Sequence, residues 1–198
     1  MTRVAEARKD VATAFRAEWS SHAYSVSNQY DAWQDALNST YCDFDIAPRS
    51  SQRYSAQVVS HSLPSFGVIE CVCDPCEAKR GSRQISRDDP EVLGVQLVLA
   101  GKEFMEIDGE QYDLVPGDII IWDSTRHMEF AVTERLHKIS LMLPLRRLRD
   151  WAPVARSQVC QVIDGHTGAG RVLGGFILSM SPVATDQPYN SGEALSES

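Results

Sequence analysis

The sequence predicts a mainly β protein of the α+β class, built around an antiparallel jelly-roll β-barrel with helices before and after it. From about residue 54 to residue 144, short runs of β-branched and aromatic residues alternate with turn residues, which gives about eight candidate strands. On both sides of this stretch, apolar residues recur at helical spacing. Many short strands joined by tight turns are typical of closed or sandwiched antiparallel sheets.

The segment before the barrel is predicted to form two helices. An imperfect apolar stripe that ends at Trp19 predicts a helix over residues 4–19. A second helix follows, with Ser27 as its cap and apolar residues at helical spacing from Tyr30 to Tyr41. Because one face of this second helix is apolar, we expect it to pack against the rest of the protein.

The first and last strands of the barrel are predicted from alternating apolar runs. "YSAQVVSHSLPSFGVIECVC" (residues 54–73) predicts two strands, and "RQISRDDPEVL" (residues 83–93) predicts a short strand and a turn at residues 88–90. "MEFAVT" (residues 128–133) and "LHKISLMLP" (residues 136–144) predict the closing strands. No internal repeat is visible along the chain.

Residues 94–123 predict four further strands, with turns at residues 100–102, 108–109 and 116–118. Asp-Gly at 108–109, between alternating runs, is the strongest short indication of a hairpin. In the turn at 116–118, proline fixes φ, glycine tolerates a positive φ, and aspartate can accept hydrogen bonds from nearby backbone amides. The run "IIIWD" then predicts a strand that is buried on both faces.

After the barrel the pattern becomes helical again. "LPLRRLRDWA" predicts a short helix, and "GAGRVLGGFILSM" predicts a helix with one apolar face that carries Leu173, Phe176, Ile177 and Met180. The last residues are polar and broken by prolines, as in a linker or a frayed tail. We therefore divide the chain into residues 1–50 (helical), 51–144 (barrel), 145–181 (helical) and 182–198 (tail).

The composition is that of an ordinary globular protein that needs neither disulfides nor a structural metal to fold. Its 198 residues suit one domain, which buries roughly 70% of the surface of the unfolded chain. With 19 Lys and Arg against 27 Asp and Glu, the net charge is −8. An acidic chain repels phosphate, so we do not expect this segment alone to bind nucleic acid. Neither a secretion signal nor an apolar run of membrane-spanning length is visible, which predicts a cytoplasmic location.

The barrel invites comparison with metal-binding cupins, which carry a His-x-His and a Glu on one hairpin and a further His after a Pro-x-Gly turn. Here Ile119, Ile120 and Ile121 follow the turn, and the preceding hairpin "GKEFMEIDG" has Glu103 and Glu106 but no histidine. Two carboxylates without imidazole are a poor set of ligands for a transition metal. The sequence therefore predicts neither a metal site nor another cofactor.

The order of motifs resembles the N-terminal ligand-sensing domain of AraC/XylS-family transcriptional regulators. The resemblance rests on "WQDALNSTYCDFDIAP", "SRQISRDD", "LVLAGKEFMEIDGEQYDLVPGDIIIWDSTR", "LMLPLRRL" and "GAGRVLGGFI" in this order, from about Trp33 to Met180. It implies a cupin-like barrel that binds a small organic effector, followed by a helical dimerisation segment (residues 145–181). In the family a DNA-binding helix-turn-helix module follows; only 17 residues follow Ser181 here, so we expect that module to be absent from this chain.

Three residues are candidates for binding the effector. Gln96 interrupts an apolar strand, and it could point into the barrel or equally face solvent. Trp122 and His127 follow the 116–118 turn and could line the rim or the interior of the barrel, although a core tryptophan and a surface histidine are the plainer interpretation. The same helix face named above, Leu173, Phe176, Ile177 and Met180, is the candidate dimer contact.

The five cysteines are expected to be reduced thiols, because their number is odd and no secretion signal is present. "CVCDPC" places Cys71, Cys73 and Cys76 together, but a structural zinc takes four ligands and no fourth is apparent. Incidental thiols at a strand end are therefore the favoured interpretation, while a redox role stays open.

Three functions are compatible with these features. The first is a non-enzymatic, effector-binding domain of a homodimeric AraC-type regulator that reaches DNA only through the missing module and does not bind membranes. The second is a cupin enzyme acting on small organic substrates, with or without a metal. The third is a free-standing scaffold that pairs with full-length regulators. The sequence does not identify the effector.

Overall fold

The computed structural model describes residues 15–48, 53–87, 91–146, 148 and 160–181. Its strands are β1 (Phe15–Ser20), β2 (Asp45–Ile46), β3 (Ala56–Ser62), β4 (Gly67–Cys73), β5 (Glu77–Arg80), β6 (Val92–Ile107), β7 (Glu110–Leu114), β8 (Asp118–Asp123), β9 (Met128–Pro144) and β10 (Gln161–Asp164). Its helices are α1 (Gln29–Thr40), α2 (Ser82–Ile85) and α4 (Gly168–Ser179), with short 3-10 turns η1 (Ser21–Ala23) and η2 (Val26–Asn28).

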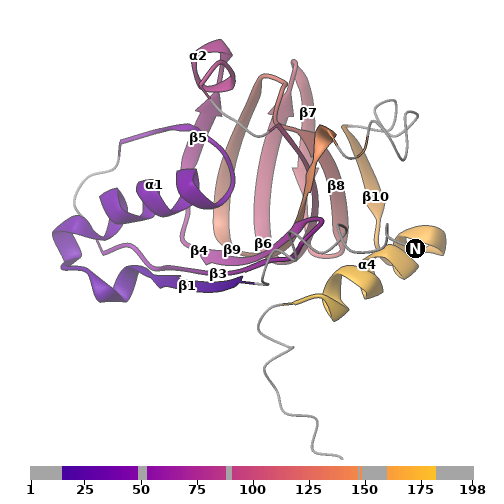
Figure 1. Cartoon of the computed structure of the whole chain (residues 1–198), viewed down its shortest axis with the longest axis horizontal. Helices are drawn as coiled ribbons and strands as arrows, with labels where there is room; N and C mark the ends of the chain where they lie inside the picture. Colours follow the sequence, from indigo (N-terminus) through magenta and orange to yellow (C-terminus); the bar gives the residue numbers. More distant parts are fainter. Residues whose placement is uncertain (1–14, 49–52, 88–90, 147, 149–159, 182–198) are drawn as a thin grey trace, which may run out of the picture.

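The sheet is organised around two long antiparallel strands, β6 and β9. They pair from Val92 opposite Pro144 to Ile107 opposite Met128. At one end of this ladder β8 and β4 add to its two sides, and at the other end β7 and β5 do so. The main path runs β1-β3-β4-β9-β6-β8-β10, and the sheet curves around an interior (Figure 1). With β1 and β10 at its two edges, the sheet is an open cupin-like jelly roll and not a closed barrel.

An irregularity in the β6–β9 ladder decides which side chains of β6 face the interior. The register shifts between Val98 and Glu103, where Gly101 has a φ of +81°. Before this bulge the inward positions carry even numbers, as for Gln96, and after it they carry odd numbers, as for Glu103. The extra residue of a β-bulge has this effect on a pleated strand.

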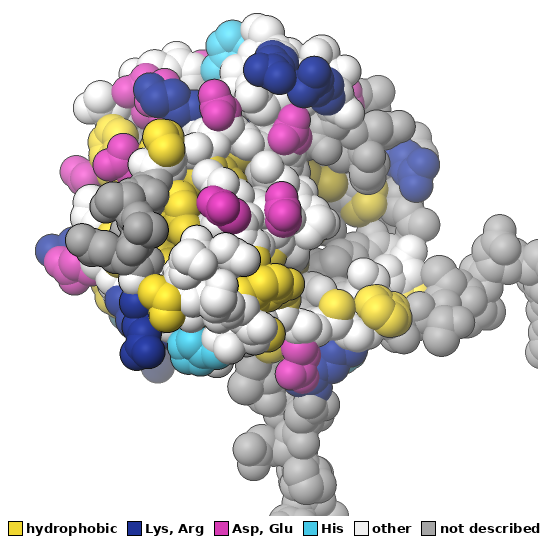
Figure 2. All heavy atoms as spheres, turned by 90° about the vertical axis from the view of Figure 1, so that its left-hand side faces the viewer, with side chains coloured by type: hydrophobic (Ala, Val, Ile, Leu, Met, Phe, Trp, Pro, Cys, Tyr) yellow, Lys and Arg dark blue, Asp and Glu magenta, His cyan; other side chains and the backbone are white. Residues whose placement is uncertain are grey.

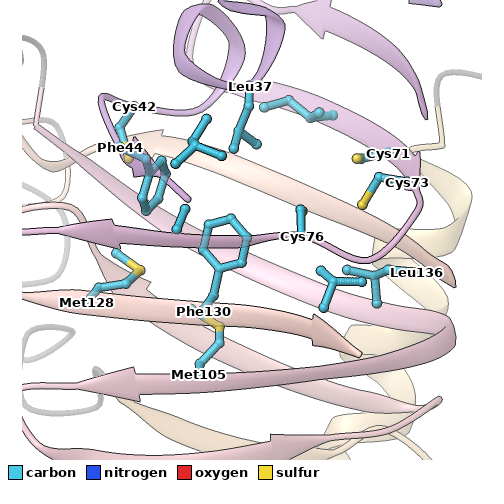
Figure 3. Close-up of a cluster of buried hydrophobic side chains, with 14 of the residues drawn as sticks. Leu37, Cys42, Phe44, Cys71, Cys73, Cys76, Met105, Met128, Phe130 and Leu136 are labelled. Carbon is cyan, nitrogen blue, oxygen red and sulfur yellow. The ribbon is translucent and has the colours of Figure 1, made fainter. Parts of the chain in front are cut away.

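The interior is filled by a large apolar core that joins the strands to α1. Tyr30, Trp33 and Leu37 on one face of α1 pack over the inward face of the sheet. Figure 3 shows part of this core, with side chains from the sheet and from α1 directed toward one another. The apolar face that the sequence predicts for this helix therefore does cover the core, as expected.

A second apolar layer lies on the outer face of the sheet, beneath α4. Ile177 of α4 is fully buried there, and the partly buried Leu173 and Met180 pack against the same layer. The sheet contributes Val68, Leu93, Val95, Leu97, Ile119, Ile139 and Leu141. Both faces of β8 and of the central ladder are thus covered, which explains why "IIIWD" reads as a continuous apolar run.

Much of the predicted local structure is confirmed. The second N-terminal helix forms as α1, although Asn28 and not Ser27 stands at its cap position. The Asp-Gly hairpin has positive φ at Asp108 (50°) and Gly109 (88°), as a type I′ turn requires. In the next turn the Val115 N–H donates to the Asp118 carboxylate at 3.0 Å.

The prediction of a helix over residues 4–19 is wrong for its described part. Residues 15–20 form β1, which pairs antiparallel with β3 along its whole length, and residues 4–14 lie outside the described residues. Pairing supplies hydrogen bonds to the otherwise open backbone of β3, and this tertiary gain outweighs an imperfect helical stripe.

Three further predictions need correction. Residues 82–85 form the helical turn α2, where the Gln84 side chain accepts a hydrogen bond from the Gly81 N–H at 3.2 Å, so no strand forms there. The predicted turn at residues 100–102 is the bulge within β6, and residues 128–144 form one strand, because both continue the long ladder. Of "LPLRRLRDWA", the described residues after the strand are helical; the remainder and the 182–198 tail lie outside the described residues.

Two glycines with similar backbone conformations test the bulge. A Cβ at Gly101 would lie 2.1 Å from the Arg135 carbonyl oxygen, whereas a Cβ at Gly109 would meet nothing within 4 Å. We expect Gly101→Ala to lower the free energy of unfolding by about 3 kcal/mol and Gly109→Ala by only about 1 kcal/mol, because only the first adds a clash to the cost of positive φ. Urea unfolding of both variants measures this difference, and equal losses would contradict the described bulge.

Candidate functional site

Four polar side chains are buried among apolar ones where β6 and β9 lie side by side. Gln96 and Glu103 of β6 and Lys138 and Ser140 of β9 are 1%, 2%, 7% and 0% exposed. Such residues are rarely buried unless they are paired, because removing them from water is costly. We name these four residues the interior polar cluster.

Three members of the interior polar cluster are joined by hydrogen bonds. The Gln96 Nε2 donates to Glu103 Oε2 at 2.5 Å, and the Lys138 Nζ donates to Glu103 Oε1 at 2.9 Å. Both carboxylate oxygens are therefore engaged, and the lysine and the glutamate balance each other's charge. The network joins the two halves of the bulged ladder, because Gln96 lies before the bulge and Glu103 after it.

Aromatic rings enclose the lysine of this network. The Lys138 Nζ lies 5.5 Å from the centroid of the Tyr41 ring and 5.6 Å from that of Phe130, both within reach of a cation–π interaction. Burial lowers the pKa of Lys138, but the Glu103 carboxylate and the neighbouring thiols raise it, and the result is a raised pKa. Lys138 is therefore charged at neutral pH. Tyr41 stands at the C-terminal end of α1, so this helix contributes directly to the site.

Several hydrogen-bonding groups in the interior have no partner among the residues that the structure describes. They include the Trp122 Nε1, the Ser140 Oγ and the Tyr41 hydroxyl. The two hydroxyls face each other, and burial raises the pKa of Tyr41 well above its ordinary value. A buried polar group without a partner costs about 1–3 kcal/mol, so their occurrence here calls for a functional explanation.

The indole of Trp122 lies close to the backbone of β6 at Gly94. An added Cβ at Gly94 would come within 2.1 Å of this ring, so only glycine fits below it. Gly94 is the residue opposite Trp122 in the β6–β8 ladder, and Gln96 is two positions further along the same strand. Trp122 and Gln96 therefore belong to one inward-facing surface.

Three buried thiols lie in the same core. Cys71, Cys73 and Cys76 are free, and Cys73 contacts both of the others. The pKa of Cys73 is raised by its hydrogen bond to Cys71, and that of Cys76 by its hydrogen bond to Cys73 and by burial. Among the described residues, no three His, Cys, Asp or Glu side chains are placed so that they could hold a metal ion. Nothing in the geometry therefore assigns these thiols a ligand.

The outer face of the same strands carries a second polar contact, at the end of α4. The Glu70 Oε1 lies 2.8 Å from the His137 Nε2, and the Ser181 hydroxyl donates to the other Glu70 oxygen. His137 and Lys138 are consecutive residues of β9, so their side chains point to opposite faces. The strand thereby connects the interior polar cluster to the residue that follows α4.

Comparison with known proteins gives the family. A family model described as the AraC-binding-like domain matches residues 33–186, which is most of the chain. This chain belongs to the AraC-binding-like family. The resemblance that the order of motifs indicates is therefore confirmed, and the domain is an AraC-type, N-terminal cupin-like domain.

The AraC-binding-like domain is also similar in structure to known proteins. The AraC-like transcriptional activator CuxR superposes with a TM-score of 0.71 at 17% identity, over 84% of this chain and 60% of that one. An RmlC-like cupin from Shewanella frigidimarina gives a TM-score of 0.37 at 13% identity, over 52% of this chain and 85% of that one. An uncharacterised protein in the nit 5′ region of Bacillus sp. (strain OxB-1) is 24% identical over 125 residues. The match covers 62% of this chain and 48% of that relative, so the chain spans about half the length of this relative.

The structure brings together two of the three candidate effector residues of this AraC-binding-like domain. Gln96 and Trp122 face the interior, whereas His127 is exposed on the loop before β9. There the His127 Nε2 lies 3.0 Å from the Ser82 hydroxyl, beside an outer cavity of about 610 Å³. His127 is close to Trp122 in sequence, but β8 ends at Asp123 and the chain then turns out of the interior.

Sequence reasoning missed the partners of Gln96. From the sequence, Glu103 is recognisable only as a poor metal ligand, and Lys138 and Ser140 have no feature that marks them one by one. One pattern could have found the last two: Leu136, Lys138, Ser140 and Met142 alternate with Ile139 and Leu141, so one face of an apolar strand carries a lysine and a serine. No helix among the described residues is both long and apolar enough to cross a membrane.

The buried thiols and Tyr54 predict how stability depends on pH. Burial raises the pKa of Tyr54, and the pKa values of Cys73 and Cys76 are raised above the ordinary thiol value of 9.0. Their contribution to stability is complete below the unfolded-state values and is lost as the pH rises above about 9, because the unfolded chain then releases protons that the folded chain retains.

We therefore expect the free energy of unfolding in urea to be constant from pH 7 to 8.5 and to fall from pH 9 upward. The double variant Cys73→Ala and Cys76→Ala is the control, because it should show a shallower decline. A stability that stays flat to pH 10.5 would contradict the burial of these neutral groups.

Proposed function

We propose that this chain is the effector-sensing and dimerisation domain of an AraC-type transcriptional regulator. It binds a small organic molecule at the interior polar cluster, and the resulting conformational change is passed to a DNA-binding module outside this chain. Family membership supports a ligand-binding, regulatory role and not an enzymatic one. The observation that carries the proposal is a buried ion pair among apolar and aromatic side chains, next to the Trp122 indole N–H, which has no partner among the described residues.

Stability alone does not account for the interior polar cluster. Replacing a buried ion pair by apolar residues of similar volume is often neutral or stabilising, so the pair itself is not needed for folding. Buried polar groups among apolar and aromatic side chains are, however, the usual composition of a site that orients a small ligand. The lysine, the glutamate and the aromatic rings around them fit this second role.

Helix α1 is the element that would admit the effector. It covers the interior with Trp33 and Leu37, and Tyr41 at its end lies over Lys138. Figure 2 shows the molecule from the side where α1 lies: acidic side chains occupy the middle of this face, and basic ones lie toward its rims. We propose that α1 shifts away from the sheet to expose the interior polar cluster and closes again over a bound effector.

Helix α4 is proposed to carry the dimer contact, with a different set of residues from the predicted stripe. Leu173, Ile177 and Met180 pack on the sheet of their own chain, which leaves Phe176 of the four exposed. Val172 lies one turn before Phe176 on the same outer face, and the two side chains are 75% and 51% exposed. An exposed apolar pair on a helix is a favourable place for a second copy to pack.

The route from effector to α4 is proposed to run through β9. A molecule that contacts Lys138 also acts on His137, since the two residues share one strand and face opposite sides of the sheet. His137 contacts Glu70, which accepts a hydrogen bond from Ser181, two residues after the last residue of α4. A small change in β9 would thus reach the end of α4, as coupling between two sites requires.

The effector site is tested by a thermal-shift screen of small aromatic acids, amides, amines and sugars. A molecule that binds the interior raises the melting temperature of the wild type with increasing occupancy, and the rise is lost in Glu103→Gln, because both Gln96 and Lys138 depend on that carboxylate. His127→Ala is the matched control, and it should leave the shift unchanged. A hit whose effect disappears in His127→Ala but persists in Glu103→Gln would move the site to the outer cavity and contradict this proposal.

The dimer is tested by light scattering after size-exclusion chromatography, at tens of micromolar protein. We expect a dimer for the wild type and a monomer for Val172→Asp and Phe176→Asp, because a charge in an apolar contact is costly to bury. Val26→Asp changes a similarly exposed valine beside α1 and should stay dimeric. A monomeric wild type, or dimers of all three variants, would refute the role of α4.

A further inference from the structure

We infer that the interior of this domain takes an uncharged organic molecule that presents a hydrogen-bond acceptor, such as an amide or ketone carbonyl, to Trp122 and Ser140. This inference rests on the proposed function, since it names the class of effector for the same site. It follows from where the two unpaired groups lie and from the charge balance around them.

The two groups lie on either side of one strand. Trp122 of β8 is opposite Gly94 of β6, and Ser140 of β9 is opposite Gln96 of β6, so the two residues are diagonal neighbours across β6. The Trp122 ring leans over Gly94, where its Nε1 would lie 2.5 Å from an added Cβ. The side of the indole that carries Cε2, Cζ2 and Nε1 therefore lies closest to Gly94 of β6.

The Trp122 N–H lacks an acceptor among the residues that the structure describes. The Ser140 and Tyr41 hydroxyls face each other, so one can donate to the other and one hydroxyl hydrogen of the pair is left without an acceptor. An indole N–H can only donate, and a serine hydroxyl can rotate to donate in the same direction. Trp122 and Ser140 are 3% and 0% exposed, so bulk water does not satisfy them in the closed molecule. Ligand atoms with lone pairs would supply the acceptors that these donors lack.

The charge of the ligand is limited by Lys138 and Glu103. Their charges already cancel, and each carboxylate oxygen has its own donor. A ligand carboxylate or ammonium would bring one uncompensated charge into a buried site, which is strongly unfavourable. An uncharged acceptor satisfies the donors without that cost.

The body of the ligand is expected to be apolar. The inward-facing neighbours of the two donors on β4, β8 and β9 are Ile69, Ile120 and Met142, all buried. These side chains offer no hydrogen bonds, and they favour an aromatic or aliphatic group next to the carbonyl.

Three probes of similar size separate the classes of ligand: benzamide, benzoate and benzylamine, each added to the wild type at pH 7 in a thermal-shift measurement. We expect benzamide to give the largest rise in melting temperature. Trp122→Phe and Ser140→Ala should each weaken benzamide binding by about tenfold, which is the effect of removing one hydrogen bond to a ligand.

Trp19→Phe is the matched control, since it removes another indole N–H, in β1, whose ring contacts Tyr24 and Trp33 instead. Benzamide should bind this variant as it binds the wild type. A larger shift with benzoate or benzylamine would overturn the class of ligand and leave the interior effector site standing. No shift with any probe would overturn both, and an unchanged benzamide shift in Trp122→Phe and Ser140→Ala would overturn the role of the two donors.

Discussion

The pairing of β6 with β9 is the constraint on which the rest of this structure depends. Every strand of the two halves of the jelly roll is added to this ladder directly or through a neighbour, and both helical layers pack on its faces. The ladder also brings Glu103 beside Gln96 and Lys138. Its bulge lies between Gln96 and Glu103 and turns both side chains to the inner face of β6. A regular pair of strands would place Glu103 on the outer face, where it could not hold the lysine.

The two faces of the ladder have different partners and, in our proposal, different tasks. The inner face carries the interior polar cluster and is closed by α1, whose last turn leads into Tyr41. The outer face supports α4 and ends in the contact of Glu70 with His137 and Ser181. Because consecutive residues of β9 face opposite sides, a ligand on one face and a dimer contact on the other would share the same rigid strand.

Sequence patterns were sufficient where local chemistry decides the structure. The stripe of α1, the positive φ at Asp108 and Gly109, and the doubly buried "IIIWD" strand all follow from residue type and spacing. The order of motifs also gave the family correctly. Sequence patterns failed where a residue distant in the sequence decides the local structure. Residues 15–20 form a strand because they pair with β3. Gly101 has the sequence context of a hairpin turn but lies in a bulge of the β6–β9 ladder.

In the candidate site, too, local sequence identifies some residues, and others depend on partners distant in the sequence. Gln96 and Trp122 could be singled out as unusual residues in apolar strands, and both do face the interior. In a regular strand, residues 96 and 103 would face opposite sides, because one number is even and the other odd. Only the bulge places Gln96 and Glu103 on the same face, and the sequence does not reveal the bulge. His127 is close to Trp122 in sequence, but β8 ends at Asp123 and the following turn takes His127 to the Ser82 hydroxyl, outside the interior.

The indole N–H resonances of the four tryptophans provide the most direct test of a ligand site built on this ladder. In a ¹⁵N–¹H spectrum, the Trp122 resonance is assigned by its loss in Trp122→Phe, and a molecule that stabilises the protein is then added. Our account predicts that this resonance moves downfield as the indole gains an acceptor, while the Trp19 resonance stays in place. A Trp122 resonance that does not move at saturation would contradict binding inside the sheet.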